Sequence, residues 1–371
     1  MSPLDPRLER HRPALVYDPQ EAYRAMSAAS LTDNPGNTLE RKSGSVVARA
    51  GAGLSLALLS TYRVEAGDRI DAFGDPLPAS RRFQADPAYH ERVYGRVAED
   101  DDRVWLQYWL WCYYNPKHLL GFGRHEGDWE LVQIGLDGAG EPELLTYSQH
   151  SGAEARRWED QEPHEDDHPV VYVAPLSHAC YFEAGAHPYV IGIDNPDDTL
   201  RPVLPRVEPL GDWKGWTGRW GASTGVLGGR FGGLSPASPA RQGQKWDSPS
   251  AWHTRARAAT PLRRGRAIVR QAGKATYPKL TALSATRTGG AVHVSYELDR
   301  ATLRRASRLL VTLHPADRPR QVLASETPEV SGRAGTVELP LPEASEGELI
   351  ARASAFNELR QRSDPLQAPV V

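Results

Sequence analysis

The stretch Val104–Tyr114, VWLQYWLWCYY, decides the fold, and Asn115-Pro116 ends it. It is rich in aromatic residues, it is too apolar to be exposed, and it stops at a turn dipeptide, so we predict a central β-strand. A membrane-spanning helix needs about 20 apolar residues, and this run is shorter.

Alternation along the strand divides its side chains between two faces. Leu106, Tyr108, Leu110 and Cys112 share one face, and Trp105, Gln107, Trp109, Trp111 and Tyr113 share the other. The first face is an ordinary core. The aromatic face has two interpretations: a second core under another layer, or a ligand platform in which Trp109 and Trp111 line a pocket.

A dense group of ionisable residues follows the Gly-rich turn Gly121–Gly123, in Arg124–Glu130 (RHEGDWE). We predict a strand over Asp128–Leu136, which places Asp128 and Glu130 on one face at its start. Two neighbouring carboxylates beside apolar residues repel each other unless a cation lies between them. The spacing therefore predicts a metal site.

The predicted metal ligands are His125, Asp128 and Glu130, with His125 contributing a nitrogen from the preceding turn. Oxygen donors with one imidazole or two suit a divalent cation such as Mg²⁺ or Ca²⁺, with Mn²⁺ as the alternative, better than a structural Zn²⁺.

Two further histidines stand at the ends of predicted strands. His150 ends Thr146–His150, and His178 follows the Val/Tyr strand Pro169–Ala174. Adjacent strands would bring both close to the acidic pair, so they are the candidate general bases. With Glu126, Trp109 and Trp111 they make up the predicted ligand pocket.

The chain of 371 residues suggests two or three domains, and we predict a main unit over 1–254, a basic linker over 255–276 and a small domain over 277–371. The last part has four short alternating runs, as in an all-β sandwich. These runs are Ala291–Leu298, Arg308–His314, Thr336–Leu339 and Leu349–Phe356. The basic stretch Arg255–Lys274 is either a solvated linker or a strip that binds phosphate or anionic lipid.

Composition narrows the function classes. The 44 Lys+Arg nearly balance the 47 Asp+Glu, which argues against nucleic acid as a partner. We find neither a transmembrane segment nor a secretory signal, so the default expectation is a cytoplasmic protein, with non-classical release as the alternative. Cys112 and Cys180 lie among aromatic residues, which favours buried thiols over a bridge.

The local structure of three other segments can also be predicted from the sequence. Gln20–Ser27 predicts a short helix, and Glu154–His168, with seven acids, predicts an exposed loop. Trp213, Trp216 and Trp220 stand among glycines that oppose a helix, so we expect a folded loop. These tryptophans either close the core or present rings to a sugar or membrane interface.

The segments YWLWCYYN, GRHEGDWELVQIGL, YSQHSG and HPVVYVAPLSHACYF resemble, in order and spacing, the family of vacuolar protein sorting-associated protein 62. The resemblance covers roughly residues 10 to 254, and no reaction is established for this family. Leu176-Ser177-His178 departs from the pattern, because a Gly is usual before the Ser. The end of the chain, ARASAFNELRQRSDPLQAPVV, resembles the last strands of a fibronectin type III domain.

The same core is similar, more distantly, to the necrosis- and ethylene-inducing-peptide-like cytolysins, which are β-sandwiches with a GHRHDWE heptapeptide. That resemblance implies a divalent cation held by His125, Asp128 and Glu130 beside a pocket for a sphingolipid headgroup, with His150 in the pocket. Gly127 and Glu126 depart from the heptapeptide.

The sequence thus predicts a mainly β protein: a central β-sandwich with long loops and few short helices, then a smaller fibronectin type III-like sandwich. The leading functional hypothesis is a metal-binding, cytolysin-like protein that recognises a glycan or lipid headgroup, with peripheral membrane contact. One alternative is a metal-dependent hydrolase of a phosphoester or ester. The other is a structural protein without a bound metal.

Overall fold

The computed structural model describes residues 4–257 and 278–371, with gaps at 20, 73, 117–123, 151, 161–167, 186, 190–191, 195, 197–199, 223–234, 300–305, 318–321, 331, 342–346, 358–362 and 364–365. The chain divides into two compact units. The first comprises 1–183, 189–196 and 202–263, and the second comprises 184–188, 197–201 and 264–371. The predicted Gly-rich turn and most of the predicted linker lie outside the described residues.

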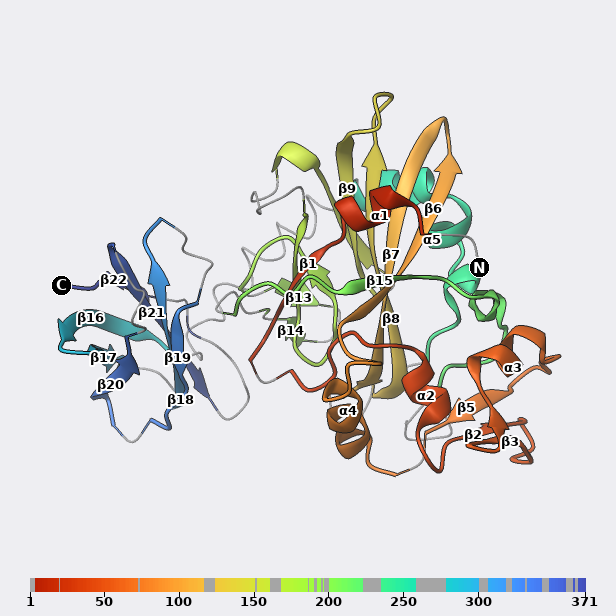
Figure 1. The fold of residues 1–371 in the computed structure, drawn as a ribbon, viewed down its shortest axis with the longest axis horizontal. Helices are drawn as coiled ribbons and strands as arrows, with labels where there is room; N and C mark the ends of the chain where they lie inside the picture. The colour runs from red at the N-terminus through yellow and green to blue at the C-terminus, as the bar shows by residue number, and fades with distance from the viewer. Residues whose placement is uncertain are drawn as a thin grey trace. The chain divides into compact units, whose positions relative to one another are not determined.

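A six-stranded sheet in the order β10-β9-β8-β7-β6-β15 forms the centre of the first unit (Figure 1). Its strands are β6 (Arg92–Asp100), β7 (Arg103–Asn115), β8 (His125–Leu136), β9 (Pro142–Gln149), β10 (Gly152–Arg157) and β15 (Arg206–Pro209). Neighbours are antiparallel except β15 and β6, which are parallel. The predicted central strand is confirmed as β7.

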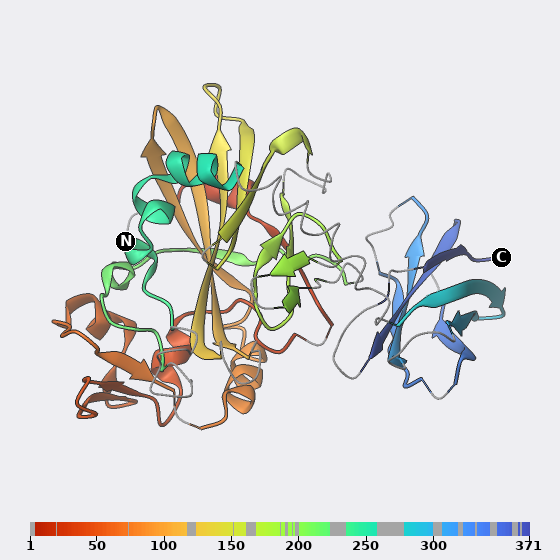
Figure 2. The ribbon, with the colours of Figure 1, turned by 180° about the vertical axis from the view of Figure 1, so that it is seen from behind.

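Two smaller sheets accompany the central one. Strands β1 (Ala14–Tyr17), β11 (Val170–Val173) and β12 (Cys180–Tyr181) form the first, and β4 (Gly53–Leu54), β3 (Val46–Ala50), β2 (Thr38–Glu40) and β5 (Arg69–Asp71) form the second. The short strands β13 (His187–Tyr189) and β14 (Gly192–Asp194) follow β12. In Figure 2 the sheet of β2–β5 lies beyond one end of the central strands.

The helices are short, as predicted. They are α1 (Pro6–Arg10), α2 (Ala29–Asp33), α3 (Leu56–Thr61), α4 (Pro76–Gln84), α5 (Gln244–Asp247), the 3₁₀ turns η1 (Trp158–Asp160), η3 (Asp212–Gly215) and η4 (Pro239–Arg241), and a helical stretch over 249–257.

Two local expectations were wrong. Residues 21–27 are not helical, because their amides bind elsewhere: Ala25 N–H donates to the Tyr17 hydroxyl and Met26 N–H to the carbonyl of Trp111. The predicted loop Glu154–His168 begins inside β10, where Glu154 is buried, while Glu159 and Asp160 are exposed and residues 161–167 lie outside the described residues.

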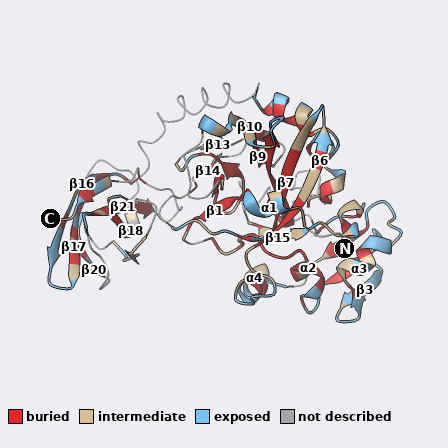
Figure 3. Cartoon of the chain, turned by 45° about the horizontal axis from the view of Figure 1, so that its top comes forward, coloured by how far each residue is buried: buried red, intermediate tan, exposed pale blue. Residues whose placement is uncertain are grey.

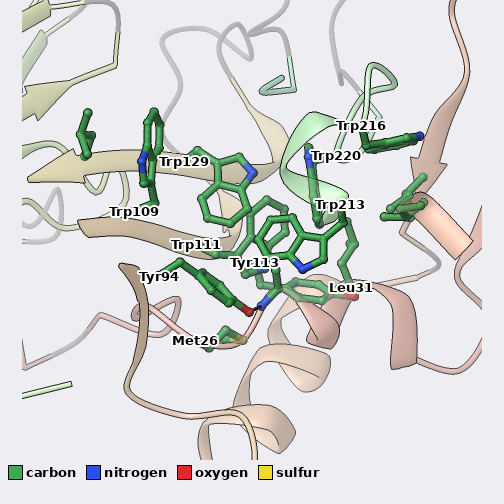
Figure 4. Close-up of a cluster of buried hydrophobic side chains, with 14 of the residues drawn as sticks. Met26, Leu31, Tyr94, Trp109, Trp111, Tyr113, Trp129, Trp213, Trp216 and Trp220 are labelled. Atoms are coloured by element: carbon green, nitrogen blue, oxygen red, sulfur yellow. Dashed lines mark hydrogen bonds between the residues drawn. The ribbon is translucent and has the colours of Figure 1, made fainter. Parts of the chain in front are cut away.

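Both faces of the central sheet are buried (Figure 3). One face packs on the β1-β11-β12 sheet through aliphatic residues such as Leu106, Leu110 and Val171. The opposite face carries an aromatic cluster that includes Trp109, Trp111, Trp129, Trp213, Trp216 and Trp220 (Figure 4). The predicted division of β7 between two faces is confirmed, and the aromatic face is core.

The two cysteines are free and buried, as expected. Burial raises the pKa of both the Cys112 and the Cys180 thiol well above the usual value. They therefore act as small apolar side chains.

The second unit is a two-sheet sandwich around one apolar core. Strands β16 (Leu280–Thr288), β17 (Ala291–Leu298) and β20 (Ala334–Pro340) form one sheet, and β19 (Ala324–Glu326), β18 (Ala306–Pro315), β21 (Leu349–Asn357) and β22 (Leu366–Pro369) form the other. Each of the four predicted runs is a strand. The relation of this second unit to fibronectin type III domains stays a prediction.

Among the described residues, no helix is both long enough and apolar enough to span a membrane.

We predict that Trp109→Ala lowers the free energy of unfolding by about 3–5 kcal/mol, because this fully buried indole would leave a cavity. Denaturant unfolding followed by fluorescence measures the change. Val46→Ala, at a side chain 40% exposed, is the control and should change stability by less than about 0.5 kcal/mol. A Trp109→Ala protein as stable as wild type would contradict the core role.

Candidate metal centre

The site lies at the start of β8, where this strand pairs with the end of β7. His125 pairs with Asn115 and Asp128 with Cys112, so β8 begins three residues before the predicted start. Asp128 and Glu130 share the face that continues into Val132, as predicted, and are 3% and 0% exposed. Two carboxylates therefore stand at the edge of an apolar core.

His150 meets this pair from the end of β9. Its Nδ1 lies 3.0 Å from Glu130 Oε1 and 3.7 Å from Asp128 Oδ1. One ligand atom from each of the three residues lies within 4.8 Å of the others. Among the described residues, Asp128, Glu130 and His150 are thus the group whose potential ligand atoms lie close enough to hold one metal ion.

The backbone of His150 adopts a left-handed conformation, with φ of 54°. This conformation is uncommon for a residue with a side chain and costs of the order of 1 kcal/mol. The backbone N–H of His150 donates to Glu130 Oε1 at 2.8 Å. The turn is thereby tied to the carboxylate that its imidazole faces.

Other polar side chains contact the carboxylate oxygens of Asp128 and Glu130 that do not face His150. Asp128 Oδ2 accepts a hydrogen bond from Asn115 Nδ2 and lies 3.1 Å from His178 Nδ1, and the Ser148 hydroxyl donates to Glu130 Oε2. His178 is fully buried and also has a left-handed backbone, with φ of 55°. His178 contacts the Asp128 oxygen that does not face His150, and it thereby orients the carboxylate.

The electrostatics of the site favour ionised carboxylates. Burial alone would raise the pKa of Asp128, but His150, His178 and His125 hold it well below its usual range. Burial lowers the pKa of His150, yet the attraction of Asp128 and Glu130 outweighs this and raises it to about 10. A positive charge is therefore strongly favoured between these carboxylates.

His125 lies beside the group of three. Its Nδ1 is 2.6 Å from the carbonyl oxygen of Gly127, and its ring centroid lies 6.5 Å from that of His150. Burial lowers the pKa of His125, while the nearby Asp128 acts in the opposite direction. Of the predicted ligands, Asp128 and Glu130 belong to the group, and the nitrogen within it comes from His150.

The predicted pocket needs correction at Trp109 and Trp111. Both side chains are fully buried in the aromatic cluster, on the face of the sheet opposite Asp128 and Glu130. The sequence pattern could not show that the layer with Trp213, Trp216 and Trp220 covers this face. These two tryptophans therefore cannot contact a ligand together with His150.

Glu126 binds the backbone of two other segments of the chain. Its Oε2 accepts backbone N–H groups from Ala72 and Ala222, each at 2.8 Å. Burial raises the pKa of Glu126 to about 7. This predicted pocket residue thus ties two segments to the strand that carries the carboxylates.

Gly127 is required by close packing. Its φ is 65°, and a Cβ there would lie 2.3 Å from Trp111 Cη2 and 2.4 Å from the Trp220 carbonyl oxygen. A side chain therefore has no room at this position.

Sequence reasoning missed four contributors to the site: Glu21, Asn115, Ser148 and Lys245. Glu21 Oε1 lies 3.9 Å from His178 Nε2, and Lys245 Nζ donates to the carbonyl of His150. The only local signal for Ser148 is its position near the end of β9, two residues before His150. Glu21 and Lys245 come from distant parts of the chain and leave no local signal.

Neither a known family model nor a curated protein matches the chain. Among solved structures, the chain is similar to a DUF3823 family protein from Bacteroides ovatus, with 13% identity over 25% of this chain and 55% of that one, at a TM-score of 0.22. The chain thus spans about half the length of that protein.

The structural neighbours also include NLPPya and a necrosis-inducing protein. NLPPya in complex with glucosamine is 19% identical over 49% of this chain and 70% of its own, at a TM-score of 0.30. Necrosis and Ethylene inducing Protein 2 from the causal agent of cocoa's Witches Broom disease is 15% identical over 57% and 78%, at a TM-score of 0.34. These values describe a distant similarity, and the case for the site rests on its own geometry.

We predict that Gly127→Ala destabilises the protein by about 2–4 kcal/mol, because the added methyl group overlaps Trp111 and the backbone conformation is left-handed. Gly138→Ala is the matched control, since nothing lies within 4 Å of its Cβ. Thermal and denaturant unfolding of both variants test this. Equal stabilities of the two variants would refute the packing argument.

Proposed function

We propose that this protein binds a divalent cation through Asp128, Glu130 and His150 and uses the cation to recognise a glycan or lipid headgroup. The observation that carries the proposal is the convergence of two buried carboxylates and one imidazole at the end of the central sheet. Mg²⁺ or Ca²⁺ suits the two oxygen donors, and Mn²⁺ also accepts the imidazole.

The charge balance supports a cation. Two carboxylates taken out of water repel each other and lose hydration, and this costs several kcal/mol unless positive charge compensates. The protonated imidazole of His150 can fill this role, and so can a divalent ion, which would bind the neutral ring as a ligand. The donors from Asn115, His178 and Ser148 hold the outer oxygens in place for either partner.

Recognition of a headgroup follows from the small number of protein ligands. Ca²⁺ takes six to eight oxygen ligands and Mg²⁺ takes six, so three protein ligands leave coordination positions for other oxygens. Sugar hydroxyls and phosphate groups supply such oxygens. The side chain of His150 is 20% exposed, so the centre borders solvent on this side.

The order of the motif segments supports a relation to the vacuolar protein sorting-associated protein 62 family and, more distantly, to the cytolysins. The segments that resemble vacuolar protein sorting-associated protein 62 and the cytolysins fold into β7, β8, β9 and the β11–β12 connection, which meet at the site. We therefore include a cytolysin-like activity at membrane surfaces in the proposal.

The hydrolase alternative gains no support from the two candidate bases. His178 is fully buried and its Nδ1 faces Asp128, while Nδ1 of His150 faces Glu130. His178 is therefore shielded from an attacking water, and Nδ1 of His150 already faces a carboxylate.

We predict that Ca²⁺, Mg²⁺ or Mn²⁺ raises the melting temperature, and that the raised value falls after EDTA. A ligand that binds only the folded state stabilises it by about 2.7 kcal/mol at one hundred times its dissociation constant. Calorimetric titration and elemental analysis should show about one ion per chain.

Asp128→Asn should abolish this response, because it removes one charged ligand and keeps the size of the side chain. Asp212→Asn is the control, since that carboxylate is 90% exposed and lies outside the site. A wild-type protein that binds none of the three ions would refute the metal site.

We predict that binding to glycan arrays or to liposomes with sugar headgroups requires the cation. EDTA and Glu130→Gln should each reduce binding at least about tenfold, since both empty the same centre. Binding that survives both treatments would remove the cation from the recognition step.

A further inference from the structure

Lys245 is a buried lysine beside the candidate metal centre. Its side chain is 7% exposed, and lysine is almost never fully buried without partners. Its Nζ donates to the carbonyl oxygen of His150 at 2.8 Å and to Gln242 Oε1 at 3.3 Å. Burial lowers the pKa of Lys245, with Glu130 and Asp128 acting in the opposite direction.

The contact with His150 completes the support of a strained residue. The N–H of His150 is held by Glu130, and its C=O is held by Lys245. Both ends of a left-handed residue are therefore fixed by charged side chains. This backbone conformation decides where the imidazole points.

Lys245 itself is held by a row of polar side chains across the central sheet. Arg96, Gln107, Gln133 and Thr146 are partners in register on the neighbouring strands β6, β7, β8 and β9. Figure 2 shows the segment of α5 and residues 249–257 lying across these strands.

Each member of this polar row binds that segment. Gln107 Nε2 donates to the Lys245 carbonyl at 2.6 Å, Arg96 Nη1 to the Trp246 carbonyl at 2.9 Å, and Gln133 Nε2 to the Pro249 carbonyl at 3.1 Å. The Thr146 hydroxyl lies 2.7 Å from His253 Nδ1. Four anchors inside an apolar layer fix the position of Lys245 against the sheet.

We propose that Lys245 is a positioning residue of the metal centre: docked by the polar row, it holds the carbonyl of His150 so that Nδ1 faces Asp128 and Glu130. The inference rests on the proposed function and deepens it. It makes the segment from Gln244 onward a part of the cation site, although that segment supplies none of the three ligands.

Lys245 has two opposite effects on the affinity for a cation. Positioning of His150 raises the affinity, whereas the positive charge of the ammonium group lowers it, because it repels a cation. Two substitutions separate the effects. Lys245→Gln removes the charge and keeps a donor on a slightly shorter side chain, whereas Lys245→Met removes both the charge and the donor. Lys214→Met is the control for the loss of a lysine, because Lys214 is a surface residue near Asp212.

The experiment titrates each full-length variant with Mn²⁺ alone. Positioning predicts that Lys245→Met binds about tenfold or more weakly than Lys245→Gln, as is typical when a group that orients a ligand is lost. Lys214→Met should match wild type. Equal affinities of the Met and Gln variants would overturn the proposal and leave Lys245 with a charge effect only.

A second measurement uses the metal-free proteins. It tests the positioning role separately, so that its failure can be distinguished from a failure of the proposed metal binding. The NMR signals of the His150 ring should shift in Lys245→Met and stay near the wild-type positions in Lys245→Gln. His253, on the same docked segment, serves as the reference. Unshifted His150 signals in Lys245→Met would overturn the positioning role whether or not wild type binds Mn²⁺.

If Lys245→Met does not fold, Gln107→Met takes its place. This variant removes the hydrogen bond to the Lys245 carbonyl and leaves the ammonium intact. Positioning predicts weaker Mn²⁺ binding and shifted His150 signals. Unchanged values of both in a folded protein would overturn the proposal.

Discussion

The burial of two like charges at the end of one strand is the constraint on which the rest of the site depends. Asp128 and Glu130 leave water because β8 continues directly into an apolar core. Every remaining oxygen must then find a donor or a cation. The left-handed turn at His150, the second one at His178 and the buried lysine all serve this requirement.

The elements that the sequence predicted well are those set by local alternation. The period of two in β7 and β8 assigned both faces of the central sheet correctly, and β17 has the predicted bounds, Ala291–Leu298. Alternation works here because each strand buries its own side chains in a regular way. It placed Asp128 and Glu130 together for the same reason.

The features that the sequence did not predict depend on contacts between segments that are distant along the chain. Whether Trp109 and Trp111 form a core or a platform is decided by the layer that covers them, and that layer comes from residues near 213–220. The place of His150 in the group depends on a positive φ that no periodic pattern encodes. A short helix was predicted over Gln20–Ser27, but tertiary hydrogen bonds take the amides of Ala25 and Met26.

The polar row of Arg96, Gln107, Gln133 and Thr146 has a consequence for how the sheet finds its pairing. If β7 slipped by one residue, Gln107 would turn into the aliphatic core and lose its partners, at a cost of a few kcal/mol for an unpaired buried amide. A slip by two residues would keep the faces but misalign Gln107 with Gln133 and with the Lys245 carbonyl. The aromatic and aliphatic residues tolerate such shifts far better, since apolar contact has little directionality. The row therefore fixes the pairing register on a face of the sheet whose other buried side chains are mostly apolar.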